Sequence, residues 1–173
     1  IFLDDDGMGI DAITVNPYLG RDSLEPFLQR EDKGVVVLCR TSNPGGADLQ
    51  DLELDSGEPL YERVAALADL WNKNDNVGLV VGATAPEELE AVREIVPDIP
   101  FLVPGVGAQG GDAEAAVEYG LASREAWPVD VGLVNSSRGI IFAGEDAHGG
   151  DDAYFGAAGQ SAKQLKDQLN RHR

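Results

Sequence analysis

Three short segments hold the residues whose types could do chemistry. Residues 40–46 (RTSNPGG) combine hydroxyl and amide groups with a tight turn, and residues 104–112 (PGVGAQGGD) carry four glycines within seven positions. Residues 135–140 (NSSRGI) place Arg138 among small residues. Glycine backbone N–H groups can approach an anion without obstruction by a Cβ atom, and a guanidinium is a good partner for a phosphate. We therefore predict phosphate binding. The plainer alternatives are an ordinary turn, a flexible linker and a solvated surface arginine.

Five apolar runs must position these segments. Each run is short, apolar on both faces and rich in Val, Ile and Leu, which is typical of parallel strands covered on both sides. They are residues 12–16, 34–39, 77–82, 101–104 and 131–135. The three polar segments directly follow the second, fourth and fifth of these runs.

Helical patterns lie between the predicted strands. In residues 59–72 the apolar side chains repeat with a 3.6-residue period, forming one stripe: Leu60, Val64, Leu67 and Trp71. The next helix begins with a predicted capping box, in which Thr84 is the cap, Pro86 lies in the first turn and Glu87 completes the box. Its buried stripe is predicted to be Leu89, Val92 and Val96.

Two further helices are predicted near the C-terminus. Asp112 can cap a short helix that runs through Tyr119, and residues 153–169 form a final helix with Leu165 and Leu169 on one side. Strand and helix thus alternate five times without an internal linker, which indicates a parallel α/β sheet with right-handed crossovers. No glycine-rich dinucleotide fingerprint follows the first strand.

A (β/α)8 TIM barrel fits this pattern better than a dinucleotide-binding fold, but a whole barrel needs about 250 residues. We therefore predict that residues 1–173 form a single domain, a partial barrel of about five βα units. In such barrels phosphate binds at the loops after strands 7 and 8, which here are the glycine-rich segment and the Arg138 segment. A sheet that lacks three strands has two open edges. We expect marginal stability or aggregation unless another chain fills the gap.

Composition excludes several classes of function. The net charge is −18, from 31 acidic and 13 basic residues, so nucleic acid and anionic membranes are unsuitable partners. Dispersed acidity with four lysines indicates a salt-loving source, and the alternative is solubility alone. The single cysteine, Cys39, lies among apolar neighbours and suits a reducing cytoplasm. The chain opens on Ile1 without an initiator Met or a basic leader, so we expect it to begin within a longer sequence.

At the loops the sequence resembles the orotidine 5′-phosphate decarboxylases, in particular their longer-loop bacterial and archaeal branch. Five collinear stretches carry the resemblance: residues 12–22 (AITVNPYLGRD), 37–51 (VLCRTSNPGGADLQD), 78–86 (GLVVGATAP), 101–112 (FLVPGVGAQGGD) and 134–143 (VNSSRGIIFA). The resemblance implies strands 4 to 8 of a TIM barrel. It also implies a homodimer, no metal or organic cofactor, and decarboxylation of orotidine monophosphate to UMP in pyrimidine biosynthesis.

The resemblance also implies roles for residues. Ser42 would hydrogen-bond the pyrimidine, Pro104 would lie against it, and Gln109 would contact the 5′-phosphate and help close a loop. Arg138 would grip the phosphate, with help from backbone groups of the predicted phosphate loops: Gly105, Gly107, Gly110, Gly111, Ser137 and Gly139.

One departure from the family pattern concerns catalysis. The family uses a lysine in a Lys-Arg-Gly-Asp-like segment as proton donor, flanked by aspartates. No such segment occurs here, so we predict no catalytic residue in this chain and expect the lysine upstream of Ile1. Asp4-Asp5-Asp6 is interpreted as a solvated charge run. Two alternatives stay open: another phosphate-binding barrel, such as a sugar-phosphate decarboxylase or an epimerase, and a noncatalytic phosphate-binding remnant.

Overall fold

The protein is described by a computed structural model that covers residues 9–107, 110–125, 129–145 and 149–173. Its centre is a five-stranded parallel sheet in the order β1-β2-β3-β4-β5, so each strand pairs with the next strand along the chain. The strands are β1 (Ala12–Val15), β2 (Gly34–Arg40), β3 (Val77–Val81), β4 (Phe101–Pro104) and β5 (Leu133–Asn135). All five predicted strands are confirmed, with ends that differ by up to two residues. The sheet is a half-barrel with β1 and β5 at its edges.

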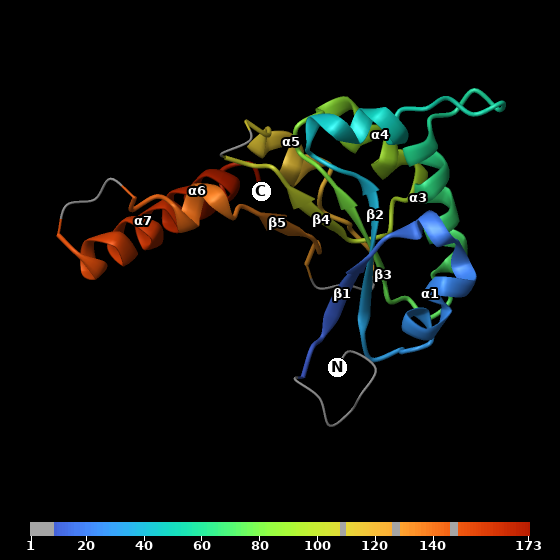
Figure 1. Ribbon diagram of the computed structural model, residues 1–173, viewed down its shortest axis with the longest axis horizontal. Coiled ribbons are helices and arrows are strands. Elements are labelled where there is room, and N and C mark those ends of the chain that lie inside the picture. Colours follow the sequence, from blue (N-terminus) through green and yellow to red (C-terminus); the bar gives the residue numbers. More distant parts are fainter. Residues whose placement is uncertain (1–8, 108–109, 126–128, 146–148) are drawn as a thin grey trace.

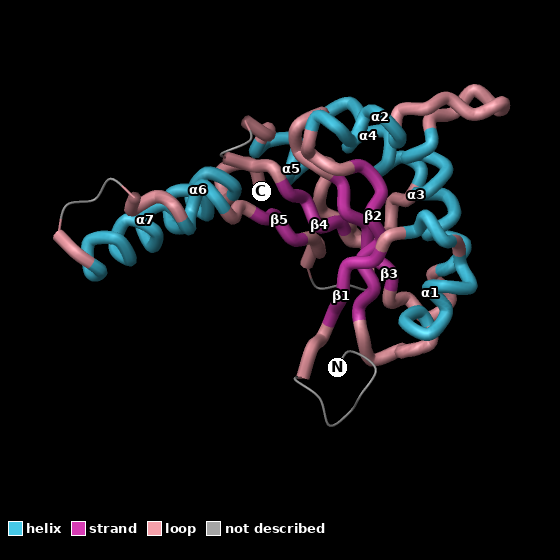
Figure 2. Tube along the Cα trace, viewed as in Figure 1, coloured by secondary structure: helices cyan, strands magenta, loops and turns pink. Residues whose placement is uncertain are grey.

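Helices connect the strands and lie together on one side of the sheet (Figure 1). Those between strands are α1 (Arg21–Leu28), α2 (Ala47–Gln50), α3 (Leu60–Trp71), α4 (Pro86–Ile95) and α5 (Ala113–Glu118), with 3-10 turns η1 (Pro17–Leu19) and η2 (Pro44–Gly46). After β5 come α6 (Arg138–Ile141) and α7 (Asp151–Leu169), which pack on each other and project away from the sheet (Figures 1 and 2). No helix in the described residues is long and apolar enough to cross a bilayer.

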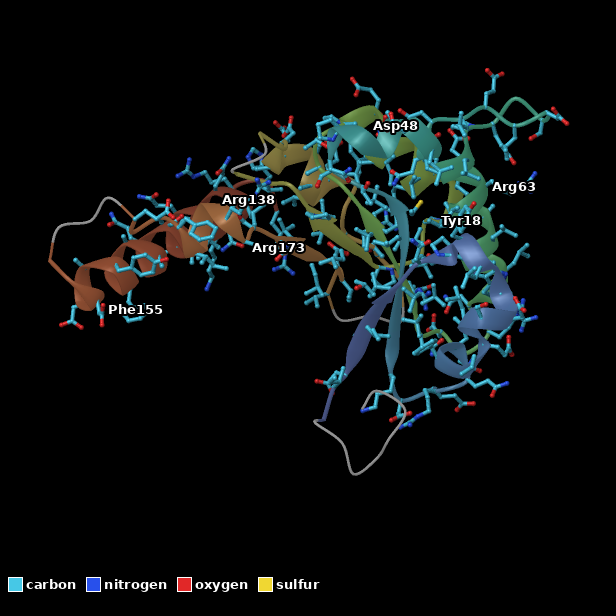
Figure 3. All side chains as sticks on the ribbon, in the orientation of Figure 1. Tyr18, Asp48, Arg63, Arg138, Phe155 and Arg173 are labelled. Atoms are coloured by element: carbon cyan, nitrogen blue, oxygen red, sulfur yellow. The ribbon has the colours of Figure 1, made fainter. Side chains whose placement is uncertain are left out.

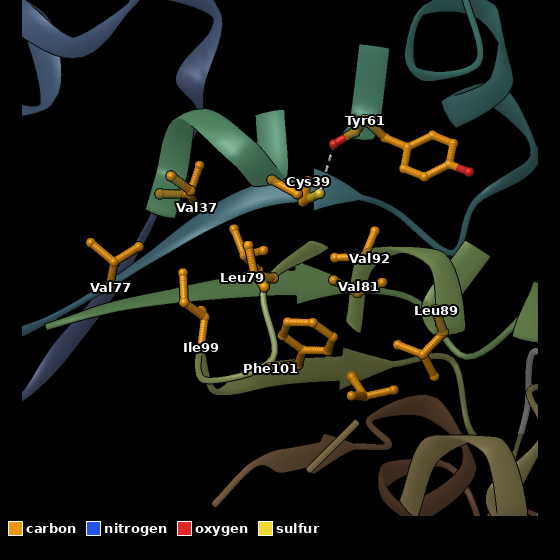
Figure 4. Packing of buried hydrophobic residues seen from close by; sticks show 14 of the residues in the cluster. Val37, Cys39, Tyr61, Val77, Leu79, Val81, Leu89, Val92, Ile99 and Phe101 are labelled. Carbon is orange, nitrogen blue, oxygen red and sulfur yellow. Dashed lines mark hydrogen bonds between the residues drawn. The ribbon is translucent and has the colours of Figure 1, made fainter. Parts of the chain in front are cut away.

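The core lies between the sheet and the helices that connect its strands (Figure 4). In β2, Val35, Val37 and Cys39 are buried, while the intervening side chains are only half-buried, because helices cover one face of the strand. The prediction that both faces of each strand are covered is therefore wrong. The predicted α4 stripe is confirmed, and its members are at most 1% exposed: Leu89, Val92 and Val96. Leu165 and Leu169 of α7 pack against the same core.

The predicted helix at residues 59–72 is confirmed as α3, and its apolar stripe, Leu60, Val64, Leu67 and Trp71, lines one groove, with Val64 and Trp71 packed against the core. The fully buried residues of α3 are Tyr61, Ala65 and Ala68.

One prediction about a helix is wrong. Thr84 does not cap α4: the N-cap is Ala85, which makes no side-chain cap. The Thr84 hydroxyl instead donates to the Ser42 carbonyl at 3.3 Å, because the loop after β3 packs against the loop after β2.

The prediction for Asp112 is confirmed. Its carboxylate accepts hydrogen bonds from the backbone N–H groups of Glu114 at 2.8 Å and Ala115 at 3.2 Å at the start of α5. Helix α1 had no distinct sequence signature, since Pro26 lies inside it and an interior proline ordinarily indicates a helix end.

Candidate functional site

The carboxyl ends of neighbouring strands are joined by backbone hydrogen bonds. The Gly82 N–H donates to the Arg40 carbonyl at 2.8 Å, and the Ala83 N–H donates to the Pro104 carbonyl at 2.9 Å. The Asp112 N–H returns to the Ala83 carbonyl at 3.0 Å. The loops after β2, β3 and β4 are therefore fixed relative to one another at the carboxyl ends of the strands, which we call the carboxyl edge of the sheet.

Ser42 lies within this edge, held in close contact by two glycines. A Cβ atom on Gly82 would lie 2.8 Å from Ser42 Cβ, and one on Gly105 would lie 3.0 Å from it. Both positions must therefore lack a side chain for Ser42 to sit where it does. The Ser42 carbonyl accepts from Thr84, whereas its hydroxyl makes no hydrogen bond with the residues that the structure describes and is available to a ligand.

Two arginines line one pocket with Ser42, and they differ in what they contact. Arg40 is 11% exposed, and its Nε lies 2.7 Å from Glu88 Oε2 and 3.2 Å from Asp51 Oδ1. Arg138, at the start of α6 (Figure 3), is exposed and forms no ion pair within the described part of the chain. The charge of Arg40 is thus neutralised inside the protein, and the charge of Arg138 is free to meet an anion.

A second pocket shares Arg138 with the first. Besides Arg138 its lining consists of Pro104, Gly105, Val106, Asn135, Ser136 and Ser137. The fold therefore brings the predicted residues Ser42, Pro104 and Arg138 to one edge, together with Gly105 and Ser137. None of the four lysines lines either pocket.

The glycine-rich loop is closed by its own backbone. The Gly110 N–H donates to the Gly107 carbonyl at 2.8 Å, and the Gly111 N–H donates to the Gly105 carbonyl at 3.0 Å. Those two N–H groups are used within the loop, which leaves the backbone nearer Gly105 and Gly107 for an anion. A Cβ on Gly107 would lie 3.3 Å from Ser136 Oγ, so this loop closely approaches the loop after β5.

Two predicted contributors need separate mention. Gln109 lies outside the described residues, as does Asp4-Asp5-Asp6. Gly139 belongs to α6, and its carbonyl accepts from Ser161 Oγ of α7 at 2.8 Å, which ties the Arg138 segment to the last helix.

Three further side chains that support the site were not predicted from the sequence: Gln50, Asp51 and Glu88. They contact residues at the end of β2 from 9 to 48 positions away along the chain. No local pattern could have indicated these contacts, because Gln50 ends a four-residue helix and Glu88 looks like any acidic residue in a first helical turn. Within the described ranges there is no group of three or more His, Cys, Asp or Glu residues placed to hold a metal.

Comparisons with known proteins identify relatives of this chain. Residues 5–151 match the family model described as orotidine 5′-phosphate decarboxylase / HUMPS family. The orotidine 5′-phosphate decarboxylase of Halorubrum lacusprofundi is 81% identical over 165 residues, covering 94% of this chain and 60% of that protein. That of Haloarcula marismortui is 74% identical over 174 residues, covering 98% and 61%.

A solved structure gives the same result. The OMP decarboxylase of Leishmania donovani superposes with a TM-score of 0.70 at 41% identity, covering 92% of this chain and 57% of that one. The chain thus spans about 60% of the length of the curated relatives that it matches.

Proposed function

The chain belongs to the orotidine 5′-phosphate decarboxylase / HUMPS family, and from that premise we propose that it supplies the nucleotide-binding edge of an orotidine 5′-phosphate decarboxylase. The observation that carries this proposal is the pocket shared by Ser42 and Arg138. Among the described residues, the Ser42 hydroxyl of this pocket makes no hydrogen bond and its Arg138 guanidinium makes no ion pair. A nucleotide monophosphate needs both groups, one for its base and one for its phosphate.

The resemblance suggests a role for each residue, and the two pockets are compatible with those roles. Ser42 hydrogen-bonds the pyrimidine, and Pro104, in the adjoining pocket, packs against the ring. Arg138 binds the 5′-phosphate, helped by backbone N–H groups near Ser137 and Gly139. The resemblance assigns a phosphate contact to Gln109 as well, and that residue lies outside the described part of the chain. The phosphate is remote from the carbon that loses CO2, and binding energy from such a non-reacting group can lower the activation barrier for decarboxylation. No lysine lines either pocket, so we propose that the lysine that donates a proton to the pyrimidine carbon lies outside these two pockets.

Two experiments test this function. Titration calorimetry of the chain with UMP, ribose 5-phosphate and xylulose 5-phosphate should show the tightest binding for UMP. Equal affinity for the pentose phosphates would favour a sugar-phosphate enzyme instead.

The second experiment measures decarboxylation. A chimera in which this chain replaces the matching 165 residues of the Halorubrum lacusprofundi relative should decarboxylate orotidine monophosphate. The intact relative is the positive control. A folded chimera that binds UMP without releasing CO2 would identify the chain as a noncatalytic phosphate-binding remnant.

We also propose that the protein acts as a cytoplasmic homodimer that uses no cofactor. An apolar groove lies between η1 and α3, and the residues that line it in the described structure include no carboxylate. Tyr18 and Leu19 beside it are 78% and 74% exposed. In a chain of charge −18, a surface without acidic groups is where a second copy meets the least repulsion. Sedimentation of Tyr18→Glu should show monomers under conditions where the unaltered protein sediments as a dimer.

A further inference from the structure

The residue that precedes Ser42, Thr41, is hydrogen-bonded to the side chain of Gln50 at two points. Gln50 Oε1 accepts from the Thr41 backbone N–H at 2.9 Å, and Gln50 Nε2 donates to Thr41 Oγ1 at 2.9 Å. One carboxamide thus holds both the backbone and the hydroxyl of Thr41. Thr41 and Gln50 are half-buried, so these bonds are partly shielded from competition by water.

Gln50 is itself fixed by Arg40. Arg40 Nη1 donates to Gln50 Oε1 at 3.3 Å and to the Thr41 carbonyl at 3.1 Å. The rest of the guanidinium is occupied by Asp51 and Glu88, the latter from the first turn of α4. The end of β2, the end of α2 and the start of α4 therefore meet at one side chain.

The space around this network leaves little room for rearrangement. A Cβ atom on Gly46 would lie 2.8 Å from Arg40 Nη1, 2.9 Å from Gln50 Oε1 and 2.9 Å from Thr41 Oγ1. On the other side of Ser42, its carbonyl is bonded to Thr84. The main chain of Ser42 is thus fixed before and after the residue, and its hydroxyl is the group left for a ligand.

We propose that Gln50, oriented by Arg40, is a positioning residue that sets the Ser42 hydroxyl for the pyrimidine. This deepens the proposed function and rests on it. Gln50 does not line the pocket that contains Ser42 and Arg138, so it acts through Thr41 and touches no ligand. A change at Gln50 should weaken binding of the base and leave binding of the phosphate unchanged, because Arg138 follows a different strand.

The test separates those two halves of the ligand. Affinities of the chain for UMP and for ribose 5-phosphate are measured by calorimetry at one KCl concentration, for the unaltered protein and for Gln50→Leu. UMP binding should weaken about tenfold in Gln50→Leu, since small displacements of a binding group have effects of that order or larger. Ribose 5-phosphate binding should change less than about twofold, because it depends on Arg138.

Three further variants complete the design. Gln50→Glu keeps an acceptor for the Thr41 N–H and should retain more UMP affinity than Gln50→Leu. Thr41→Val removes the hydrogen bonds of the Thr41 hydroxyl with Gln50 but keeps the one from the Thr41 backbone N–H. It also keeps the side-chain shape, so UMP affinity should fall by less than in Gln50→Leu. This variant provides the test if Gln50→Leu does not fold. Gln29→Leu, at an exposed glutamine that ends α1, is the matched control and should match the unaltered protein.

The outcomes are distinct. Selective loss of UMP affinity supports the positioning role. Parallel loss for both ligands shows a merely structural role, and unchanged affinities show no role, and either result overturns the inference while leaving the proposed function intact. If the unaltered protein itself binds UMP no better than ribose 5-phosphate, the proposed function fails and this inference fails with it.

Discussion

Gly105 faces Ser42 so closely that a Cβ atom on the glycine would lie 3.0 Å from Ser42 Cβ and 3.5 Å from its Oγ. Gly105 also has φ of 102°, a backbone conformation that residues other than glycine rarely adopt. The glycine-rich loop therefore determines the space around the proposed base-binding hydroxyl, in addition to any contact it makes with phosphate.

Gly105→Ala should consequently weaken UMP binding. The matched control is Gly57→Ala, which lies outside the site, where φ is 87° and no atom lies within 4 Å of the added Cβ. Both variants should lose about 1–2 kcal/mol of unfolding free energy, because each places alanine in a left-handed conformation. Calorimetry should show a loss of UMP affinity for Gly105→Ala alone. Equal losses in both variants would mean that backbone strain, and no contact with Ser42, explains the effect.

Arg138→Ala should abolish a charge-assisted contact worth about 3 kcal/mol, which corresponds to roughly a hundredfold loss of UMP affinity. Binding of uridine, which lacks the phosphate, should be unchanged. Ser42→Ala should weaken both ligands, since Ser42 is assigned to the base. The unfolding free energy of Arg138→Ala should stay within about 0.5 kcal/mol of the unaltered value, as for other exposed positions. An equal loss of uridine and UMP binding in Arg138→Ala would contradict the phosphate assignment.

Arg93 is expected to be among the residues most important for stability. Its guanidinium carbon lies 3.7 Å from the centroid of the Phe101 ring, and its Nη1 donates to the carbonyls of Val96 at 3.0 Å and Ile99 at 2.9 Å. Its Nε donates to the Tyr119 carbonyl at 2.8 Å, so one side chain joins α4, the loop before β4 and the end of α5. Burial lowers the pKa of Arg93 to about 10.

Arg93→Ala should therefore cost about 3 kcal/mol or more in urea unfolding, because several carbonyls lose a charged donor at once. Arg93→Lys should recover only part of that loss, since an ammonium cannot reproduce the planar fork. The control is Arg21→Ala, whose exposed pair with Glu25 at 3.1 Å should contribute less than about 1 kcal/mol. A loss for Arg93→Ala no larger than the control's would refute this role.

Alkaline pH should destabilise the protein. The buried Cys39 thiol donates to the Tyr61 carbonyl at 3.2 Å (Figure 4), and burial raises the pKa of Cys39 from 9.0 to about 12. Burial, followed by repulsion from Glu62 and Glu88, raises the pKa of Tyr61 from 10.0 to about 12. Both groups stay protonated in the folded state while the unfolded chain releases its protons. Stability is therefore fully present below about pH 9 and falls as pH rises toward 12.

Urea midpoints measured between pH 8 and 11 should show this decline, and Cys39→Ala should make it less steep. In the folded protein a thiol reagent should modify Cys39 only slowly at pH 8, and in urea it should react at once. Rapid modification without unfolding would show that the thiol is accessible.

Molar KCl should raise the unfolding free energy. With 31 acidic and 13 basic residues, self-repulsion opposes the compact state, and its range shrinks from about 10 Å at 0.1 M salt to about 3 Å at 1 M. Urea unfolding in 0.1 M and 2 M KCl measures the effect, with sucrose as an uncharged control for excluded-solute stabilisation. A midpoint that falls as KCl rises would contradict an adaptation to salt.

Much of the architecture follows from local sequence. Runs such as residues 34–39 and 101–104 are short and continuously apolar, a pattern typical of parallel strands. The structure confirms these strands but buries only one face of each, while the other face is half-buried. Because parallel strands end on the same side of a sheet, the segments after the second, fourth and fifth strands could be predicted to lie near one another, whereas the individual roles of Ser42, Pro104 and Arg138 were implied by the family resemblance. The N-cap at Asp112 was also predictable, since a capping carboxylate accepts hydrogen bonds from the backbone N–H groups two and three residues further along the chain.

Other features were decided only by the tertiary structure. Arg40 and Arg138 are alike in sequence, yet one is neutralised by Glu88, 48 residues away, and the other is left free for an anion. Thr84 has the residue type and spacing of a helix cap, but the approach of the β2 loop offers its hydroxyl the Ser42 carbonyl instead. A local pattern reports what a residue can do with its chain neighbours. Which partner it takes depends on distances that exist only after distant segments have packed together.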